Sequence, residues 1–384
     1  MNAEDVPRFQ YQCRGLRVVL GPGAALGLGE EVERLGCRRA AVITTPGRAA
    51  TLGPLLEALA EAGVAGEAGS HRPTAAEAGS DTRPTSGTDA GAPVWNGARV
   101  HVPREVVDSA VAWTRSVRAD ALVAVGGGSA IGVAKAVVLE TGLPILAVST
   151  TYSGSEMTSI WGITDAERKQ TGRNPRVAPR TVLYDPLLTL DLPARTSAAS
   201  GMNAMAHAVE ALYAPDRSPV AALLAEEAVR VLAGALPRVV DAPRSIPLRS
   251  EAFLGAHLAA QALEMTTMGL HHRLCHVLGG MFDLPHARLH ALLLPHVVAY
   301  QAEAAPEAMA RLGRGLGRGA EIAPGGALHA LNARLGLQEN LRDLGLTRED
   351  LDRAAAEAPL GDLPHPERMT VEGIRGILES AWAG

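Results

Sequence analysis

Short apolar runs alternate with amphipathic segments through the first half of the chain. Residues 16–36 (LRVVLGPGAALGLGEEVERLG) predict a strand, a glycine-rich turn and a helix, and residues 38–47 predict the next strand and its turn. Residues 120–142 repeat the pattern of strand, glycine turn and helix, and residues 143–158 predict a strand that ends in a loop. Strands that alternate with helices predict a parallel sheet with helices on both faces.

The second half of the chain consists of long stretches rich in Ala and Leu, with little strand signal. Residues 195–214, 219–240 and 249–280 each show the spacing of apolar residues that is typical of a helix. A length of 384 residues favours two domains over one. We therefore predict an α/β domain over residues 1–190 and an all-helical domain over residues 191–384.

Residues 66–93 interrupt the first domain with Gly, Ala, Ser, Thr, Pro and charged residues. A segment of this composition buries too little apolar surface to offset the entropy that ordering it would cost. We predict a flexible surface insertion there. Whether it is inert or covers a cleft or a partner surface stays open.

The overall composition excludes several classes of protein. Hydrophobic residues make up 47% of the chain and charged residues 20%, which is typical of packed globular proteins. A formal net charge of -5 without a basic stripe argues against a nucleic-acid partner. No apolar run reaches the roughly 20 residues that cross a bilayer, and the three cysteines are widely spaced, as expected of reduced thiols. We predict a cytoplasmic protein without a membrane partner.

The glycine turn at residues 126–128 is the first segment with a chemical signature. Three glycines after a buried strand let the backbone approach a ligand closely, and the following helix presents N–H groups and the positive end of its dipole. This pattern favours a pyrophosphate seat, although a plain structural turn looks the same and the G-x-G-x-x-G fingerprint is absent. We predict cofactor contacts from this turn and from the hydroxylated loop after the next strand: Gly126, Gly127, Gly128, Ser129, Thr150, Thr151 and Thr158.

Histidines concentrate in three segments of the helical half. In one segment an amide and an imidazole four residues apart share a helix face, and in the next two imidazoles do the same. Two more follow a proline at the start of a further helix, one turn apart. Such a concentration among Ala, Leu and Gly favours a site over separate packed residues. The set is Asn203, His207, His272, His276, His286 and His290.

Five segments, in chain order, carry a resemblance to a known family. They are GGGSAIGVAKA, STTYSGSEMTSIWGIT, TGRNPRVAPRTVLYDP, SGMNAMAHAVEALYA and GLHHRLCHVLGGMFDLPHARLHALLLPH. Together they resemble the maleylacetate reductases, a branch of the iron-containing alcohol dehydrogenase family, from about Phe9 to about residue 335. The resemblance implies a dinucleotide-binding N-terminal domain, an all-helical catalytic C-terminal domain and an active site in the cleft between them.

The resemblance also bears on metal binding. Metal-dependent members of the family bind iron or zinc through one Asp and three His, and those positions fall here on Asn203, His207, His272 and His286. A divalent cation would therefore meet three neutral imidazoles and a weak amide oxygen, with no charge to neutralise it. The maleylacetate reductase branch is similar in having Asn at this position. We predict no catalytic metal; if one is present, His207, His272 and His286 hold it.

The reaction that the resemblance implies is reduction of maleylacetate, a short dicarboxylate with a C=C bond conjugated to a ketone, or of a substituted maleylacetate, to the 3-oxoadipate. Hydride from NADH or NADPH would leave an enolate, whose charge preorganised donors must stabilise. We assign that task to His272 and His286, oriented by His207 and Asn203, with Tyr152 as a further hydroxyl donor. Protonated histidines repel one another, so the rings of the empty site should be mostly neutral.

Basic residues between the cofactor loops and the helical half suit an anionic substrate and cofactor. We assign Arg173, Arg176 and Arg180 to the substrate carboxylates and Lys169, by its position in the resemblance, to the cofactor ribose. Thr45 stands after the second strand, where an Asp would repel a 2'-phosphate, so NADPH should be accepted beside NADH.

Two alternative functions stay open. A metal-dependent alcohol or polyol dehydrogenase would keep the fold, but Asn203 argues against it. A repurposed or non-catalytic homologue would retain the nucleotide site without turnover, although the intact glycine and histidine segments argue against that. In each case we expect a homodimer.

Overall fold

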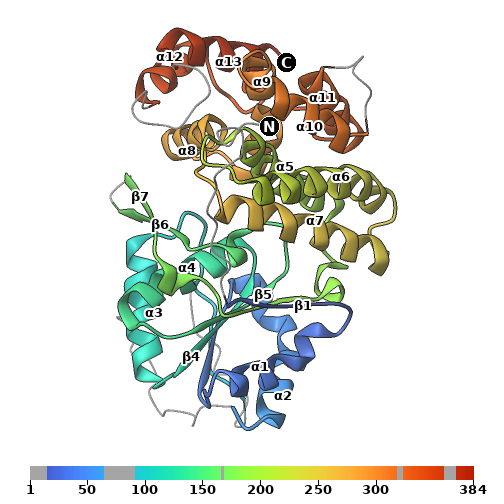
Figure 1. Cartoon of the computed structure of the whole chain (residues 1–384). Helices are drawn as coiled ribbons and strands as arrows, with labels where there is room; N and C mark the ends of the chain where they lie inside the picture. The colour runs from blue at the N-terminus through green and yellow to red at the C-terminus, as the bar shows by residue number, and fades with distance from the viewer. Residues whose placement is uncertain (1–14, 65–90, 166–167, 318–322, 359–368) are drawn as a thin grey trace, which may run out of the picture. The chain divides into compact units, whose positions relative to one another are not determined.

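The computed structural model describes residues 15–64, 91–165, 168–317, 323–358 and 369–384. Within these residues the chain forms two compact units, Gly15–Asp191 and Leu192–Gly384 (Figure 1). Almost all of the predicted insertion at 66–93 lies outside the described residues, so its flexibility stays a prediction.

A six-stranded sheet forms the centre of the first unit, with the strand order β1-β8-β5-β4-β2-β3. Every pairing in it is parallel, which confirms the predicted architecture. Strands β2, β4, β5 and β8 are buried on both faces, and this explains why they read as unbroken apolar runs in the sequence. The strands are β1 (Arg17–Leu20), β2 (Ala40–Ile43), β3 (Val94–Trp95), β4 (Ala121–Gly126), β5 (Ile145–Ser149) and β8 (Thr181–Tyr184).

Helices cover both faces of this sheet. Side chains alternate along β4, so that Leu122 and Ala124 join a core with α3 and α4, while Val123 and Val125 join a core with α1 and α2. The helices are α1 (Leu28–Arg34), α2 (Gly53–Glu61), α3 (Arg104–Ser116) and α4 (Gly128–Thr141), with short 3-10 turns at η1 (Ala24–Gly27), η2 (Pro46–Thr51), η3 (Ser155–Met157), η4 (Pro175–Val177) and η5 (Pro186–Thr189).

The first unit also contains an antiparallel hairpin of β6 (Ile160–Asp165) and β7 (Arg168–Arg173), which the sequence did not predict. Its second strand carries several charged and polar residues, and these read as a solvated connection. Gly172 pairs with Trp161, and a Cβ on that glycine would lie 2.9 Å from the indole ring. The glycine therefore lets the indole lie across the partner strand.

The second unit is helical throughout its described residues, as predicted. The predicted helical stretch at 249–280 contains a break at 265–269, where Gly269 caps the start of a new helix. The helices are α5 (Ala194–Tyr213), α6 (Pro219–Asp241), α7 (Ile246–Glu264), α8 (Leu270–Phe282), α9 (His286–Gln301), α10 (Pro306–Gly315), α11 (Pro324–Arg334), α12 (Arg348–Glu357) and α13 (Val371–Ala383).

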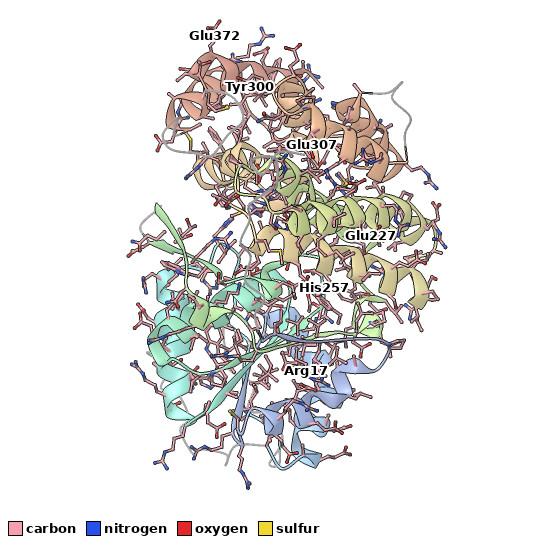
Figure 2. All side chains as sticks on the ribbon, viewed as in Figure 1. Arg17, Glu227, His257, Tyr300, Glu307 and Glu372 are labelled. Atoms are coloured by element: carbon pink, nitrogen blue, oxygen red, sulfur yellow. The ribbon has the colours of Figure 1, made fainter. Side chains whose placement is uncertain are left out.

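Helix α5 is buried along most of its length, which its small residues permit. A Cβ on Gly201 would lie 2.2 Å from the side chain of Leu236, so α5 and α6 approach each other closely at this glycine. Charged side chains such as Glu227, Glu307 and Glu372 are exposed on their helices (Figure 2). Among the described helices, none is both long enough and apolar enough to span a membrane.

Candidate active site

The predicted phosphate seat is a tight junction between β4 and α4. Gly126 has a φ of 150°, and a Cβ there would lie 2.9 Å from the side chain of Ala130. A Cβ on Gly127 would lie 2.7 Å from Oγ1 of Thr151. Any side chain at these two positions would therefore displace the turn or the loop beside it. Helix α4 begins at Gly128, so its first N–H groups face the end of β4, as an anion seat requires.

Three strand ends meet at this edge of the sheet, as the sequence predicted for two of them. The backbone N–H of Thr150, after β5, donates to the carbonyl of Gly126 at 3.0 Å. The hydroxyl of Thr44, after β2, donates to the carbonyl of Val125 at 2.8 Å. Thr45 follows directly and is half-buried. The glycine turn, the threonine loop and the residue assigned to cofactor choice thus lie along one edge.

A buried lysine supports the threonine loop from behind. Nζ of Lys135 donates to the carbonyls of Ser155 and Ile160 at 2.5 and 2.9 Å and to Oγ1 of Thr158 at 3.1 Å. The Thr158 hydroxyl also donates to the Ser155 carbonyl at 3.3 Å. Thr158 is 2% exposed, and its hydroxyl already contacts two protein groups. These contacts support the loop, and the cofactor contact of Thr158 stays a prediction.

Neither Lys135 nor Glu156, a buried acid in the loop that Lys135 supports, was predicted from the sequence. The carboxylate of Glu156 accepts hydrogen bonds from the hydroxyls of Tyr184 at 2.9 Å and Ser153 at 3.2 Å. Burial raises the pKa of Glu156. The sequence offered one indication of this contact, which is that Lys135 interrupts the apolar part of a helix. A buried charge is tolerated only where hydrogen-bond acceptors surround it, so the lysine indicates acceptors nearby.

The other residues assigned to ligands in the first unit are less constrained by the structure. Tyr152 is fully buried. Arg173, Arg176 and Arg180 are exposed. The side chain of Lys169 lies outside the described part of the chain. These assignments stay predictions.

The histidines of the second unit do come together, from α5, α8 and α9. His207 stacks on His272 with ring centroids 4.8 Å apart, and His272 lies 4.6 Å from His290. His290 is in turn 4.4 Å from His286, whose ring stacks on that of His276 at 5.5 Å. Asn203 lies on α5 one turn before His207. The predicted set is therefore one cluster, to which the structure adds His271, 5.0 Å from His290.

A buried carboxylate, Glu210, holds this cluster from behind, and the sequence analysis missed it. It is 2% exposed and accepts hydrogen bonds from the backbone N–H of His271 at 2.7 Å and from Nδ1 of His272. Although burial alone would raise it, the pKa of Glu210 is lowered, because His272 and these hydrogen bonds outweigh burial. The signal was the spacing of Asn203, His207 and Glu210, which puts all three on one face of α5.

The hydrogen bond to Glu210 fixes which atom of His272 remains for chemistry. Nδ1 is occupied, and Nε2 is buried with no hydrogen-bond partner in the described part of the chain. Because Nδ1 is held by the carboxylate, Nε2 is the ring atom left to meet a substrate, and Glu210 fixes the orientation in which the ring presents it.

Burial disfavours a positive charge on three of the surrounding rings. Burial, more than neighbouring histidines, lowers the pKa of His207 and of His290 well below the ordinary value. Burial likewise lowers the pKa of His271 to about 3, although Glu210 opposes it. These directions agree with the expectation of mostly neutral rings, with desolvation as the main cause and repulsion between rings as a secondary one.

The residues at the family's metal position do not fit a tightly bound divalent cation. Imidazoles ligate in the plane of the ring, but the rings of His207 and His272 are stacked with their planes only 16° apart, so their lone pairs do not meet at one point. Nε2 of His286 is 2.9 Å from a nitrogen of another histidine. Asn203 offers a neutral oxygen donor, and the nearby carboxylate of Glu210 is engaged by His272.

A second group of donors, His271, Cys275 and His290, lies deeper in the cluster. Their ligating atoms are within 4.8 Å of one another, a spacing that could hold a soft cation. The atoms pair among themselves, with Nε2 of His271 2.9 Å from Nδ1 of His290 and 3.7 Å from Sγ of Cys275. Burial raises the pKa of the Cys275 thiol well above its ordinary value, so the neutral form predominates.

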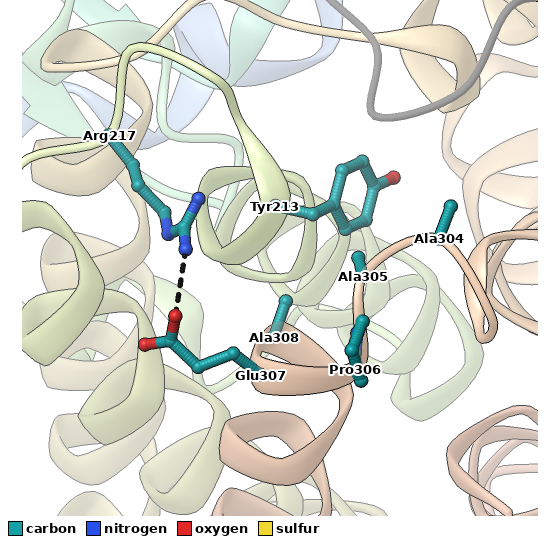
Figure 3. Close-up of a pocket in the computed structure, with 7 residues that line it drawn as sticks. All are labelled: Tyr213, Arg217, Ala304, Ala305, Pro306, Glu307 and Ala308. Carbon is teal, nitrogen blue, oxygen red and sulfur yellow. Dashed lines mark hydrogen bonds and ion pairs between the residues drawn. The ribbon is translucent and has the colours of Figure 1, made fainter.

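A pocket at the far end of α5 offers less chemistry (Figure 3). Arg217 pairs with Glu307 across it at 3.2 Å, and the other lining residues are Tyr213, Ala304, Ala305, Pro306 and Ala308. Its charges are already paired, so we do not assign it a role in the reaction.

Comparison with known proteins agrees with the resemblance seen in the sequence. Residues 83–186 match the model of the iron-containing alcohol dehydrogenases, and residues 197–382 match that of the C-terminal region of the Fe-containing alcohol dehydrogenase family. The chain is 43% identical to maleylacetate reductase of Burkholderia cepacia over 98% of both chains. It is also 43% identical to maleylacetate reductase 2 of Cupriavidus pinatubonensis, over 99% of this chain and 98% of the relative.

Solved structures give the same answer. The crystal structure of maleylacetate reductase from Agrobacterium tumefaciens is similar with a TM-score of 0.85 and 39% identity, over 98% of this chain and 99% of that one. The chain is therefore an oxidoreductase of the iron-containing alcohol dehydrogenase family, on its maleylacetate reductase branch.

Proposed function

We propose that this protein reduces the conjugated C=C bond of maleylacetate, or of a substituted maleylacetate, to the 3-oxoadipate with NADH or NADPH and without a metal ion. The observation that carries the proposal is His272, backed by the buried carboxylate of Glu210 among neutral imidazoles. The identity of about 40% to maleylacetate reductases supports the choice of substrate.

The glycine turn supports the cofactor half of the proposal. Gly126 and Gly127 admit no side chain, and the N–H groups that follow them at the start of α4 would hold the pyrophosphate together with Ser129. A nicotinamide cofactor supplies a hydride when bound. Thr45 carries no negative charge that would repel a 2'-phosphate, so we propose that NADPH serves as well as NADH.

The histidine cluster supports the substrate half. Addition of a hydride to the carbon β to the ketone leaves an enolate, whose oxygen carries the negative charge. Nε2 of His272 would carry the N–H that donates to that oxygen, and Glu210 would hold the ring in place through Nδ1. The enolate then takes a proton at the carbon α to the ketone. His286, which is half-buried, is the proposed donor of that proton, with His276 stacked against it.

The remaining polar groups would orient the reacting histidines and hold the substrate. Asn203 and His207, on α5, would orient His272 and His286, and the exposed guanidinium groups of Arg173, Arg176 and Arg180 would bind the two carboxylates. We further propose that the protein acts as a homodimer in the cytoplasm.

The test is the fall in absorbance of NADH on addition of maleylacetate, run with enzyme before and after exhaustive chelation. We expect turnover that chelation does not change. Turnover that chelation abolishes would support the metal-dependent dehydrogenase instead. A binding signal for NADH without any turnover on enone dicarboxylates would support a repurposed homologue.

A further inference from the structure

A chain of three histidines runs from the core of the second unit to the proposed proton donor. Nε2 of His271 lies 2.9 Å from Nδ1 of His290, and Nε2 of His290 lies 2.9 Å from Nε2 of His286. His271 and His290 are both 0% exposed, whereas His286 is half-buried. The mechanism proposed above uses only the outer member, so the two buried histidines lack a role.

The protons in this chain are constrained because both ring nitrogens of His290 are engaged. A neutral imidazole has one N–H and one lone pair, so His290 donates to one neighbour and accepts from the other. The ring of His290 is 0% exposed, an environment that favours its neutral form. The hydrogen bonds between the three histidines can therefore be donated in one of two directions, and each direction fixes which nitrogen of His286 carries the proton.

The buried end of the chain favours one direction. Nδ1 of His271 has no hydrogen-bond partner in the described part of the chain. If His290 donated to His271, a proton would have to lie on this nitrogen, and a buried N–H without an acceptor is less tolerated than a buried lone pair. His271 therefore donates to His290, which donates to Nε2 of His286. The proton of neutral His286 then lies on Nδ1.

We propose that His290 is a positioning residue, whose hydrogen bond to Nε2 of His286 holds that ring in one orientation with its proton on Nδ1. This inference rests on the proposed function only in treating His286 as the donor to the enolate. It predicts that the link from His290 to His286 matters for turnover more than the link from His290 to His271.

Two substitutions separate these links, because the amide of Gln reaches the place of imidazole Nε2 and the amide of Asn reaches that of Nδ1. His290→Gln keeps a partner for His286, and His290→Asn keeps a partner for His271. We expect His290→Gln to retain kcat within about threefold and His290→Asn to lose about 10- to 100-fold, with KM little changed in both, as for groups that orient a reacting histidine. Equal losses in the two variants would overturn the inference and indicate a packing role.

A matched control comes from another buried histidine of the same helix. His296 is 8% exposed, and its Nδ1 lies 2.8 Å from Oγ of Ser380. His296→Gln should lower the unfolding temperature without changing kcat. If His296→Gln lowered kcat as much as His290→Asn, substitution of any buried residue of α9 would slow turnover, and the inference would also be overturned.

A readout independent of turnover is the nitrogen-15 spectrum of the histidine rings, recorded for the wild type and for both His290 variants. The inference expects a protonated Nδ1 on His286 in the wild type and in His290→Gln, and a mixture of tautomers in His290→Asn. Protonated Nε2 on His286 in the wild type would contradict it.

Absence of any wild-type rate with maleylacetate would overturn the proposed function alone, since the spectrum still decides the tautomer. Stoichiometric zinc or iron in the wild type, lost in both His290 variants and in Cys275→Ser, would overturn the inference in favour of a metal at the deeper donor group.

Discussion

Replacing Glu210 by Gln removes the charge behind His272 while keeping the volume of the side chain. In the wild type one carboxylate oxygen accepts the backbone N–H of His271 at 2.7 Å, and the other accepts from Nδ1 of His272. The amide of Glu210→Gln has only one oxygen. We expect that oxygen to keep the backbone bond, so that the amide N–H turns toward Nδ1 of His272.

The consequence is a change in which ring nitrogen of His272 is held and by what. Facing a donor, Nδ1 must accept, so the ring carries its proton on Nε2 and loses the carboxylate that held Nδ1. A donor to the enolate thus survives, less firmly oriented. We expect kcat to fall on the order of 100-fold, or about 3 kcal/mol in the activation free energy, with KM for maleylacetate little changed. His272→Ala, which removes the donor altogether, should lose on the order of 1,000-fold.

The assay is steady-state oxidation of NADH at saturating cofactor, with thermal unfolding of each variant measured alongside. The stability cost of Glu210→Gln should be about 1.5 to 3 kcal/mol, the usual range for a hydrogen bond to a charged group. A matched control is Glu226→Gln on α6, a partly exposed acid paired with Arg311 and Arg314, which should leave kcat unchanged. A folded Glu210→Gln enzyme with kcat within threefold of the wild type would refute the role of the carboxylate.

Three further predictions concern pH, the glycine turn and cofactor choice. Burial holds the pKa of His271 at about 3 and that of His290 well below its ordinary value. Below a pH of about 6.5 these groups gain protons on unfolding, so the unfolding free energy should be highest above that pH and fall as the pH drops toward 4. Urea unfolding midpoints at pH 7.5 and pH 5 measure this fall, and equal midpoints would contradict the prediction. Gly127→Ala places a Cβ 2.7 Å from Oγ1 of Thr151 and should raise KM for NADH about tenfold or more without unfolding the protein; an unchanged KM would exclude the turn as the cofactor seat. The wild type should oxidise NADPH at a rate comparable to NADH, and Thr45→Asp should lower kcat/KM for NADPH selectively; a wild type that oxidises NADPH hundreds of times more slowly would show that discrimination lies elsewhere.

Much of the first unit could be read from the sequence because its strands are buried on both faces. The apolar runs at β2, β4 and β5 leave no other interpretation once helical segments separate them. The β6–β7 hairpin was not predicted from the sequence, since its second strand carries charged residues and its pairing brings Trp161 against Gly172. Local composition does not record such a contact.

The same contrast applies to the site. Histidines at helical spacing predicted a cluster, because α5, α8 and α9 each present one face to the core. Glu210 and His271 were missed, since an acid in an amphipathic helix ordinarily faces solvent and only the packing of α5 against α8 reveals its partner. The contact of Thr158 with Lys135 could not be predicted, because a hydroxyl at a strand end suits a ligand and a buried lysine equally well.

The central claim is that imidazoles with a carboxylate behind them, and no metal, stabilise the enolate. The most direct measurement is the rate of NADH oxidation with maleylacetate by enzyme whose residual metal has been quantified by mass spectrometry after chelation. The account predicts an undiminished rate at far less than one metal ion per chain. A rate that vanishes with the metal and returns on addition of iron or zinc would contradict it.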